Sequence, residues 1–340
     1  MSKPFVKITL AVLFIGLLVQ SAEKVAAADR LTGLHSAQVM SQSMPWIAQE
    51  AGLFKKYDLD FRLVFIPSSP VATAATLNGD AEIGVTGAIG NVRAYVQGFN
   101  DLVFIGGVKN FLTHSIVAKP DIKRPEDLKG KKVAVGRFGG NTHYFTIQAL
   151  RKFGMDASKD IQTIQTGGGP ETLAALLAGN VDAAGLVAPG DAAAVNRGYG
   201  YVINGFDLRI PYGATQFVTL RSTVNKRGPV IGRFMRVMAE SATIMHTDKN
   251  FVYKVLGKYL RVTDTKILDS AYQTEIPALE RRLEIRDAAL QASLDEIAPS
   301  DPPGQDHQTA GTDRPEVSGR AGEERCFREV KPLDLLSSRE

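Results

Sequence analysis

Side chains that could carry chemistry are scattered along this sequence of 340 residues rather than gathered into a catalytic motif. Its five histidines are His35, His114, His143, His246 and His307. They show neither H-x-x-x-H nor H-E-x-x-H spacing and have no cysteine beside them, so the sequence predicts no zinc site. Each histidine is more simply interpreted as a surface residue or as a hydrogen-bonded residue of the core.

A serine nucleophile is the other catalytic possibility. Ser68, Ser69 and His143 could be arranged as nucleophile and base, but the G-x-S-x-G elbow that exposes such a serine is missing. The sequence also lacks a G-x-x-x-x-G-K-[ST] loop, which argues against nucleotide binding. It therefore predicts a protein that binds a ligand without a cofactor, a metal or a chemical step.

Several loops are suited to holding a ligand, because ligands of open α/β sheets gather where helix N-termini point free amides into a crevice. These loops are 38–46, 68–69 and 86–88 in the first half of the chain, and 137–142, 167–169 and 188–190 in the second. Glycines of 136–142 let the backbone approach a ligand, and Arg137 could add a charged donor. A glycine-rich turn with a capped helix and a solvated arginine explains that segment equally well. Trp46 could line the cleft or lie in the core.

The elements that must position these loops alternate between strand and helix patterns. Short apolar runs predict strands at 61–66, 103–106, 132–135 and 161–164. Helical patterns lie between them at 45–51, 71–77, 142–153 and 171–178. This alternation predicts an α/β architecture with mostly parallel sheets.

An internal repeat predicts two lobes of similar construction. Residues 70–85 and 170–185 match at an offset of 100, so that Pro70 corresponds to Pro170 and Gly79 to Gly179. A proline suits the first helical turn, and a glycine suits the position just past the helix end. Chance similarity between alanine-rich helices is the alternative explanation.

The N-terminus predicts an exported protein. Two lysines precede an apolar run at 8–19, and three alanines end at Ala28, which is the pattern of a signal peptide cleaved before Asp29. Residues 1–28 hold three lysines and one glutamate, so their removal lowers the formal charge from +4 to about +2. Such a small charge argues against a nucleic-acid partner. The lone cysteine, Cys326, can form no disulfide within the chain.

The last segment of the chain differs from the rest. Between residues 299 and 325 the only large aliphatic residue is Val317, among many prolines, glycines and charged residues. Because such a segment buries too little apolar surface to offset its ordering entropy, we expect residues 299–340 to be a disordered tail.

Four segments of the sequence resemble segments of the substrate-binding proteins of ABC transporters of the nitrate, sulfonate and taurine type, also called NMT1-like. They read MPWIAQEAGLFKKYDLDFRLVF, LNGDAEIGVTG, PEDLKGKKVAVGRFGG and LLAGNVDAAGL. The resemblance covers roughly residues 30–295 and implies the type II periplasmic-binding fold, with two α/β lobes joined by two hinge strands. Lobe 1 would comprise 29–113 and 215–298, and lobe 2 would comprise 114–214. The hinges would lie near 112–117 and 214–220.

The resemblance also implies a site, a partner and a mechanism. The ligand contacts would be Gln38, Ser43, Trp46, Ser68, Ser69, Thr86, Arg137, Gly140, Asn141, Thr142 and Gly168. A monomer in the periplasm would close on a small, anionic solute and deliver it to a membrane permease driven by a cytoplasmic ATPase. Sulfonates, taurine, nitrate-like anions and aromatic carboxylates remain open as ligands.

Two other functions compete with this interpretation. One is a sensory module that presents ligand to a receptor in trans. The other is an enzyme like the pyrimidine synthase related to the family, but that enzyme carries a cysteine-rich motif and this chain has one cysteine.

Overall fold

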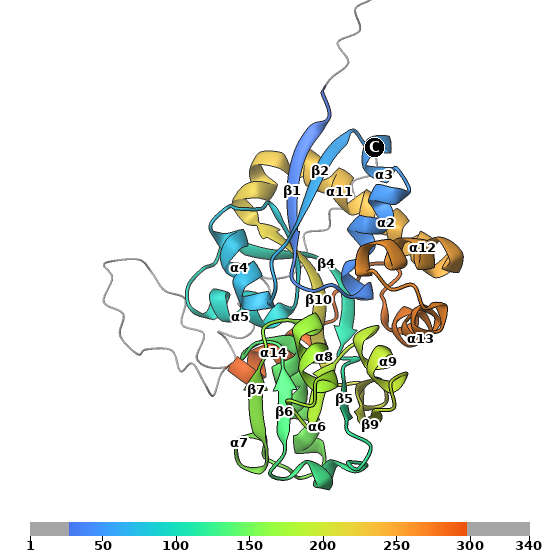
Figure 1. The fold of residues 1–340 in the computed structure, drawn as a ribbon. Coiled ribbons are helices and arrows are strands. Elements are labelled where there is room, and N and C mark those ends of the chain that lie inside the picture. Colours follow the sequence, from blue (N-terminus) through green and yellow to red (C-terminus); the bar gives the residue numbers. More distant parts are fainter. Residues whose placement is uncertain (1–26, 298–340) are drawn as a thin grey trace, which may run out of the picture.

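The computed structural model describes residues 27–297, which form two lobes, each built on a five-stranded sheet (Figure 1). All but the last two residues of the predicted signal peptide lie outside the described residues. The predicted tail, with Cys326, also lies outside them. Among residues 27–297, no helix combines the length and the apolar character needed to span a bilayer.

Lobe 1, the upper lobe in Figure 1, has the strand order β2-β1-β3-β10-β4. Its strands are β1 (Asp29–His35), β2 (Leu59–Phe65), β3 (Ile83–Thr86), β4 (Leu102–Phe111) and β10 (Pro211–Leu220). Its helices are η1 (Met40–Gln42), α2 (Met44–Glu50), α3 (Leu53–Lys56), α4 (Ser69–Leu77), α5 (Ala88–Val96), α11 (Arg221–Thr247), α12 (Lys249–Leu260), α13 (Thr265–Glu275), η3 (Ile276–Ala278) and α14 (Asp287–Ile297). Strands β1, β2 and β3 are parallel, whereas β10 runs antiparallel to both β3 and β4.

Lobe 2 repeats this plan with the strand order β7-β6-β8-β5-β9. Its strands are β5 (Ser115–Ala118), β6 (Lys132–Val135), β7 (Gln162–Gln165), β8 (Ala183–Leu186) and β9 (Gly200–Asn204). Its helices are η2 (Pro125–Leu128), α6 (Asn141–Lys152), α7 (Ala157–Asp160), α8 (Gly169–Leu177), α9 (Gly190–Val195) and α10 (Gly205–Leu208). Only β5 is reversed, as only β10 is in lobe 1. The predicted α/β fold with mostly parallel sheets is therefore confirmed.

The predicted repeat is also confirmed, residue for residue. Helices α4 and α8 begin and end 100 residues apart, and so do strands β3 and β8. Gly79 and Gly179 follow the two helices with φ angles of +80° and +74°, the left-handed conformation that glycine adopts without strain. The two lobes thus place the N-termini of α4 and α8 at corresponding points.

The chain crosses between the lobes twice, and the two crossings lie side by side. It leaves lobe 1 at residues 112–114, within the first predicted hinge, and returns through 209–210. The Leu112 amide donates a hydrogen bond to the Ile210 carbonyl at 3.0 Å. The second predicted hinge, 214–220, lies within β10, which pairs with β4 at Pro211 and again from Thr215 to Leu220. The predicted lobe boundary at residue 215 falls inside the same strand.

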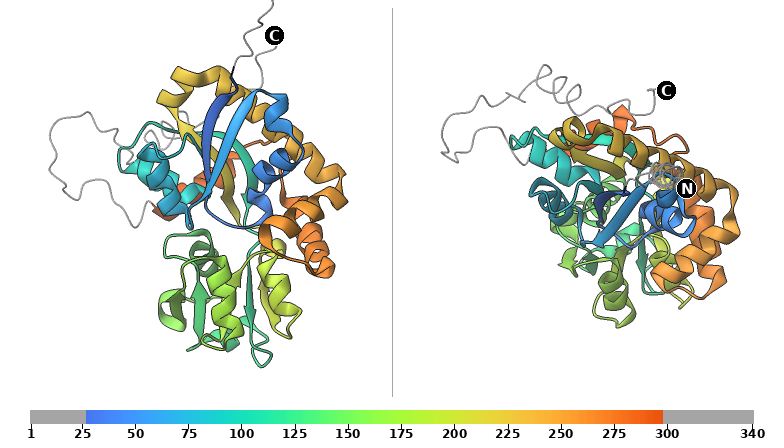
Figure 2. Two further views of the ribbon diagram at one scale, coloured as in Figure 1. Left: turned by 45° about the horizontal axis from the view of Figure 1, so that its top comes forward. Right: turned by 90° about the horizontal axis from the view of Figure 1, so that it is seen from above.

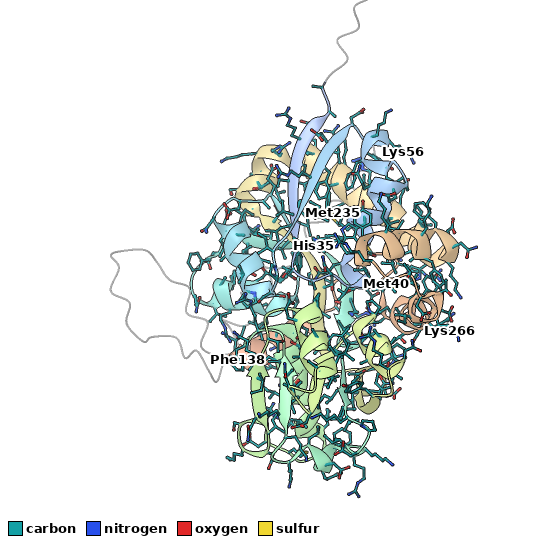
Figure 3. The ribbon with its side chains drawn as sticks, in the orientation of Figure 1. His35, Met40, Lys56, Phe138, Met235 and Lys266 are labelled. Atoms are coloured by element: carbon teal, nitrogen blue, oxygen red, sulfur yellow. The ribbon has the colours of Figure 1, made fainter. Side chains whose placement is uncertain are left out.

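Two large apolar clusters hold the molecule together. One lies between the sheet of lobe 1 and the layer of α2, α11 and α12, and it includes Phe217, Phe234 and Met235 (Figure 3). The other is continuous across both lobes, since it contains Val92 and Phe104 of lobe 1 together with Phe145 of lobe 2. The lobes therefore share a core beside the crossing segments.

Helix α14 lies where the two lobes meet, and the left view of Figure 2 shows the lobes stacked one above the other. It packs against β10 and α5 of lobe 1. It also contacts α6 of lobe 2, because the Gln148 amide donates to the Glu296 carboxylate at 2.8 Å and Tyr144 packs near Ala292.

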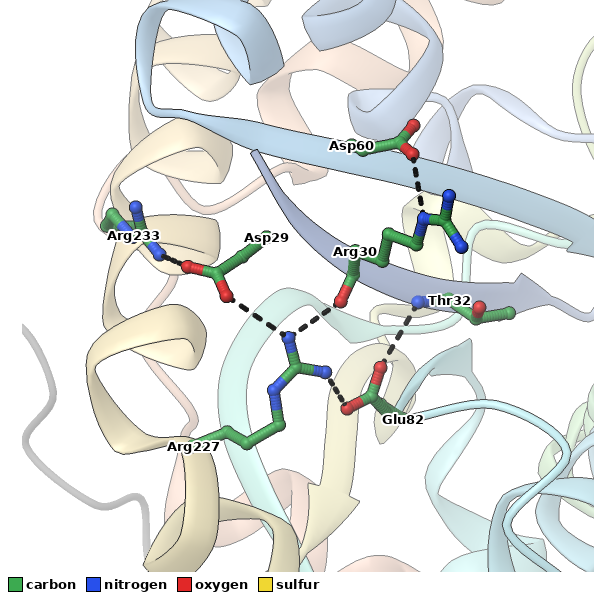
Figure 4. Close-up of polar contacts among 7 residues, drawn as sticks. All are labelled: Asp29, Arg30, Thr32, Asp60, Glu82, Arg227 and Arg233. Atoms are coloured by element: carbon green, nitrogen blue, oxygen red, sulfur yellow. Dashed lines mark hydrogen bonds and ion pairs between the residues drawn. The ribbon is translucent and has the colours of Figure 1, made fainter. Parts of the chain in front are cut away.

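The start of β1 is held by a small charged network (Figure 4). Arg233 bonds to the Asp29 carboxylate, and Arg227 bonds to Glu82 and donates to the Arg30 carbonyl at 2.7 Å. Arg227 has non-helical dihedral angles and lies two residues before Pro229, where α11 is kinked. At the kink, Arg227 of α11 contacts the start of β1.

Candidate ligand-binding site

A cavity of about 100 Å³ lies between the lobes. Loops of lobe 1 and lobe 2 both contribute walls, and Thr215 of β10 and Lys109 of β4 contribute from the sheet of lobe 1. Among the described residues, no group of three or more His, Cys, Asp and Glu side chains could hold a metal ion.

The loop after β1 forms one wall and is folded by Gln42. The Gln42 side-chain oxygen accepts hydrogen bonds from the amides of Ser36 at 2.8 Å and Ala37 at 2.9 Å. The hydroxyls of Ser41 and Thr215 share a hydrogen bond of 2.9 Å, which joins this loop to β10.

Ser68 occupies a strained position in the same wall. Its φ of +82° is unusual for a residue with a side chain, and it lies directly before α4. Hydrogen bonds from the Ser68 amide to Ser36 and from Ala72 to the Ser68 carbonyl, both 3.0 Å, hold it there. Its hydroxyl is buried without a hydrogen-bond partner. Strain and an unpaired buried hydroxyl, in a residue that lines the cavity, together indicate a ligand contact.

The opposite wall comes from the start of α6. Thr142 accepts a hydrogen bond from the Gly136 amide at 2.9 Å, and Gly139 supports the turn with a φ of +72°. Asn141 reaches across to lobe 1, where its amide donates to the Ala214 carbonyl at 2.9 Å and its oxygen accepts from Tyr212 at 3.2 Å. Asn141 therefore ties the lobes together across the cavity.

Three helices point their N-termini into this cavity: α4, α6 and α8, whose first residues Ser69, Asn141 and Gly169 all line it. No side chain of residues 27–297 caps any of the three, so the N–H groups that their first turns carry can bind a ligand. Each N-terminus carries about half a positive charge from the helix dipole. Arg137 lines the same cavity and makes no ion pair within residues 27–297. The arrangement favours an anion.

A buried ion pair lies beside the cavity. Lys109, which is 1% exposed, donates hydrogen bonds of 2.8 Å to Glu275 and to Thr113. Thr113 in turn donates to the second oxygen of Glu275. The positive charge of Lys109 and the negative charge of Glu275 are therefore paired and hydrogen-bonded, which offsets the free-energy cost of burying them.

His114 lies in the first crossing segment and also lines the cavity. It is 5% exposed and packs against the Phe145 ring. No hydrogen bond joins its ring to any described residue, and Nδ1 is buried without a partner. Burial, with a smaller contribution from the charge of Lys109, lowers the pKa of His114 to about 3. The ring is therefore neutral at neutral pH.

Seven of the eleven predicted contact residues line the cavity: Ser68, Ser69, Arg137, Gly140, Asn141, Thr142 and Gly168. The other four do not. Gln38 is exposed on the loop after β1, and Thr86 is buried with its hydroxyl unpaired. Ser43 bonds to the Met40 carbonyl, and Trp46 stacks on Tyr259 at 5.0 Å. Trp46 thus lies in the core, because α2 packs its apolar face against α11 and α12 rather than toward lobe 2.

Sequence reasoning missed the residues that reach the cavity from the strands and the crossing segment: Lys109, His114 and Thr215. A charged residue inside the apolar run 102–111 was the one available signal for Lys109, since an isolated charge in a buried strand must find a partner. Phe138, on the loop before α6, does not line the cavity and is 53% exposed (Figure 3).

Comparison with known proteins gives a consistent picture. The family described as NMT1/THI5 like matches residues 43–249. The taurine-binding periplasmic protein of Escherichia coli K12 is 34% identical over 116 residues, which are 34% of this chain and 35% of that protein. The match therefore spans about a third of the relative's length.

Two solved structures share the fold over most of the chain. The alkanesulfonate-binding protein SsuA from Xanthomonas axonopodis pv. citri, bound to MOPS, has a TM-score of 0.69 at 20% identity, over 81% of this chain and 94% of that one. The periplasmic aliphatic sulphonate binding protein SsuA of Escherichia coli has a TM-score of 0.66 at 23% identity, with the same coverage. At this level of identity the likeness shows the fold.

Proposed function

Because the chain belongs to the NMT1/THI5-like family, we propose that it is an exported receptor of an ABC importer that captures a small organic anion. The observation that carries this proposal is the convergence of three uncapped helix N-termini on one cavity between the lobes. Free amides and aligned dipoles stabilise an anion without needing a full counter-charge. Ser68, Arg137 and Thr142 are the side chains best placed to bind it.

The relatives support a sulfonate or a chemically similar anion as the ligand. One is named as a taurine-binding protein and two as binding proteins for alkane or aliphatic sulfonates. We extend this to a function without catalysis, in which the protein hands its ligand to a membrane permease. We propose that a monomer in the periplasm binds the ligand, since residues of a single chain form the walls described above.

Capture would proceed by closure of lobe 2 on lobe 1. A ligand held by α4 on one side and by α6 and α8 on the other makes more contacts in the closed form. Its differential affinity then shifts the equilibrium between open and closed forms. The bonds of Asn141 to Ala214 and Tyr212 would form in the same step.

A thermal-shift screen of the chain from Asp29 onward tests this function. Ethanesulfonate, benzenesulfonate, benzoate and nitrate are compared with putrescine and calcium chloride. At a hundredfold excess over its Kd, a ligand stabilises the native protein by ~2.7 kcal/mol, and we expect this only from anions. Arg137→Gln should reduce the shift, whereas Lys123→Gln, on the exposed far side of lobe 2, should not. A shift produced by the cations alone would contradict the proposal.

Export has its own test. The full-length chain, expressed in a Gram-negative host, should appear in the periplasmic fraction with Asp29 as its first residue. Recovery of the uncleaved chain in the membrane fraction would contradict this part of the proposal.

A further inference from the structure

The charged side chains that line the cavity are both cations. They are Lys109, which is paired with Glu275, and Arg137, and no Asp or Glu among residues 27–297 lines the cavity. An anionic ligand can bind there to the helix N-termini and to Arg137. An ammonium group finds no carboxylate among the lining residues, and leaving a charged group unmatched in a cavity is costly.

The nearest buried acids are already engaged. Both oxygens of Glu275 accept hydrogen bonds, one from Lys109 and one from Thr113, and its side chain is fully buried. Asp191 in α9 accepts from the Ala192 amide at 2.7 Å and from Tyr201 at 3.3 Å, and it does not line the cavity. Neither is available to pair with a cation on the ligand.

His114 is the remaining group that could bind a polar part of the ligand. It is buried, lines the cavity and has no protein partner for its ring. The neutral ring carries one N–H, which can donate a hydrogen bond to an oxygen of an anion.

We propose that this site selects organic anions that carry no ammonium group, and that His114 helps to determine this selectivity. The inference rests on the proposed function and narrows its ligand class: plain alkane- or arenesulfonates and carboxylates bind, and zwitterions such as taurine are rejected. The inference therefore predicts that this chain differs in its ligand from the relative named as taurine-binding. The two proteins are 34% identical over only 116 residues.

Ethanesulfonate and taurine form the decisive ligand pair, because they differ only by the terminal ammonium group. In isothermal titration calorimetry at pH 7 with the unmodified protein, we expect ethanesulfonate to bind roughly tenfold to a hundredfold more tightly than taurine. Equal affinities, or tighter binding of taurine, would overturn the inference while leaving the proposed function intact. If no anion of the thermal-shift screen binds, the proposed function fails and the inference fails with it.

Substitution of His114 tests its part in the selectivity. His114→Asp supplies the missing carboxylate and should raise the affinity for taurine relative to ethanesulfonate by at least roughly tenfold. The control Gln162→Glu adds the same charge on the exposed strand β7 and should leave the ratio unchanged. An unchanged ratio in a folded His114→Asp protein would remove His114 from the proposal.

A spectroscopic measurement covers the case in which His114→Asp does not fold. In the unmodified protein labelled with ¹⁵N-histidine, ethanesulfonate should shift the imidazole resonances of His114 and leave those of His246 in place. The His114 signals are assigned by their loss in His114→Gln. Resonances of His114 that do not respond to saturating ethanesulfonate would show that the ring does not bind the ligand.

Discussion

At the scale of single residues, two buried carboxyl groups differ in the partners that surround them. Glu275 of α13 is matched by Lys109 and Thr113. Asp191 of α9 has no cationic partner, and burial raises its pKa to about 6, against the lowering effect of the Ala192 amide. The negative charge of Glu275 adds to the rise, which indicates that the two acids lie near each other across the lobes.

Glu275→Gln should destabilise the protein strongly. The substitution leaves Lys109 as an unmatched buried cation, a loss of about 3–5 kcal/mol in the free energy of unfolding. Urea denaturation measures it. The exposed pair of Lys249 and Asp269 provides the control, since Asp269→Asn should cost less than about 1 kcal/mol. Equal losses at the two sites would contradict the assignment of Glu275 to a buried pair.

Asp191→Asn should change how stability depends on pH. A raised native pKa means that the native state holds this proton more tightly than the unfolded state, whose pKa lies near 4. Asp191 therefore lowers stability as pH rises from about 4 to about 6, and the loss is complete above that range. At pH 7 the variant should be more stable than the parent by up to about 3 kcal/mol, less any hydrogen bond it weakens.

Urea denaturation at pH 4, 5, 6 and 7 measures this difference. Taking the variant minus the parent removes the contributions of other carboxylates, such as Asp182 and Glu240, whose pKa values are lowered by their lysine partners. A difference that does not grow between pH 4 and pH 6 would contradict the assigned environment of Asp191.

At the scale of elements, α14 is the helix that belongs to both lobes. Its buried positions recur on one face, at Ala289, Leu290, Ser293, Leu294 and Ile297. This spacing is that of an amphipathic helix, and the apolar face enters the cluster shared by the two lobes. The helix therefore stabilises the crossing region as well as lobe 1.

Leu294→Ala should lower the free energy of unfolding by about 2–5 kcal/mol, because it leaves a cavity in the shared cluster. The exposed neighbour Asp295 is the control, and Asp295→Ala should stay within about 0.5 kcal/mol of the parent. Chemical denaturation of both variants makes the comparison. A loss below 1 kcal/mol for Leu294→Ala would show that α14 is not part of the core.

At the scale of the whole molecule, closure depends on how closely the lobes approach. Gly87 at the start of α5 faces Asn141 of α6, and a Cβ atom at position 87 would come within 2.3 Å of the Asn141 side-chain oxygen. The Gly87 backbone, with a φ of −74°, is open to other residues. Position 87 favours glycine because the two lobes approach each other closely there, and not because of its backbone conformation.

Gly87→Ala should therefore act as a wedge that holds the lobes apart. We expect at least roughly tenfold weaker binding of ethanesulfonate, with little change in stability without ligand. Small-angle X-ray scattering should show a ligand-induced decrease in radius of gyration for the parent and a smaller one for the variant. Gly190→Ala has nothing nearer than 4.0 Å to its new Cβ and serves as control. Normal compaction and affinity in Gly87→Ala would contradict the wedge.

The sequence by itself determined the elements and their repetition. Helix starts at Pro70 and Pro170, the glycines that follow both helices, and the alternation of strand and helix were all predicted, because they depend on neighbours within a few residues. The loops that face the cavity could be located for the same reason, since a loop lies wherever a strand ends and a helix begins.

Only the tertiary structure decided which side chains meet. Lys109 and Glu275 are 166 residues apart, and Trp46 and Tyr259 stack although no local pattern relates them. His114 reaches the cavity only because the chain crosses between the lobes at that residue. Such contacts depend on the direction of side chains and on the packing of distant elements, and neither is encoded by spacing along the chain.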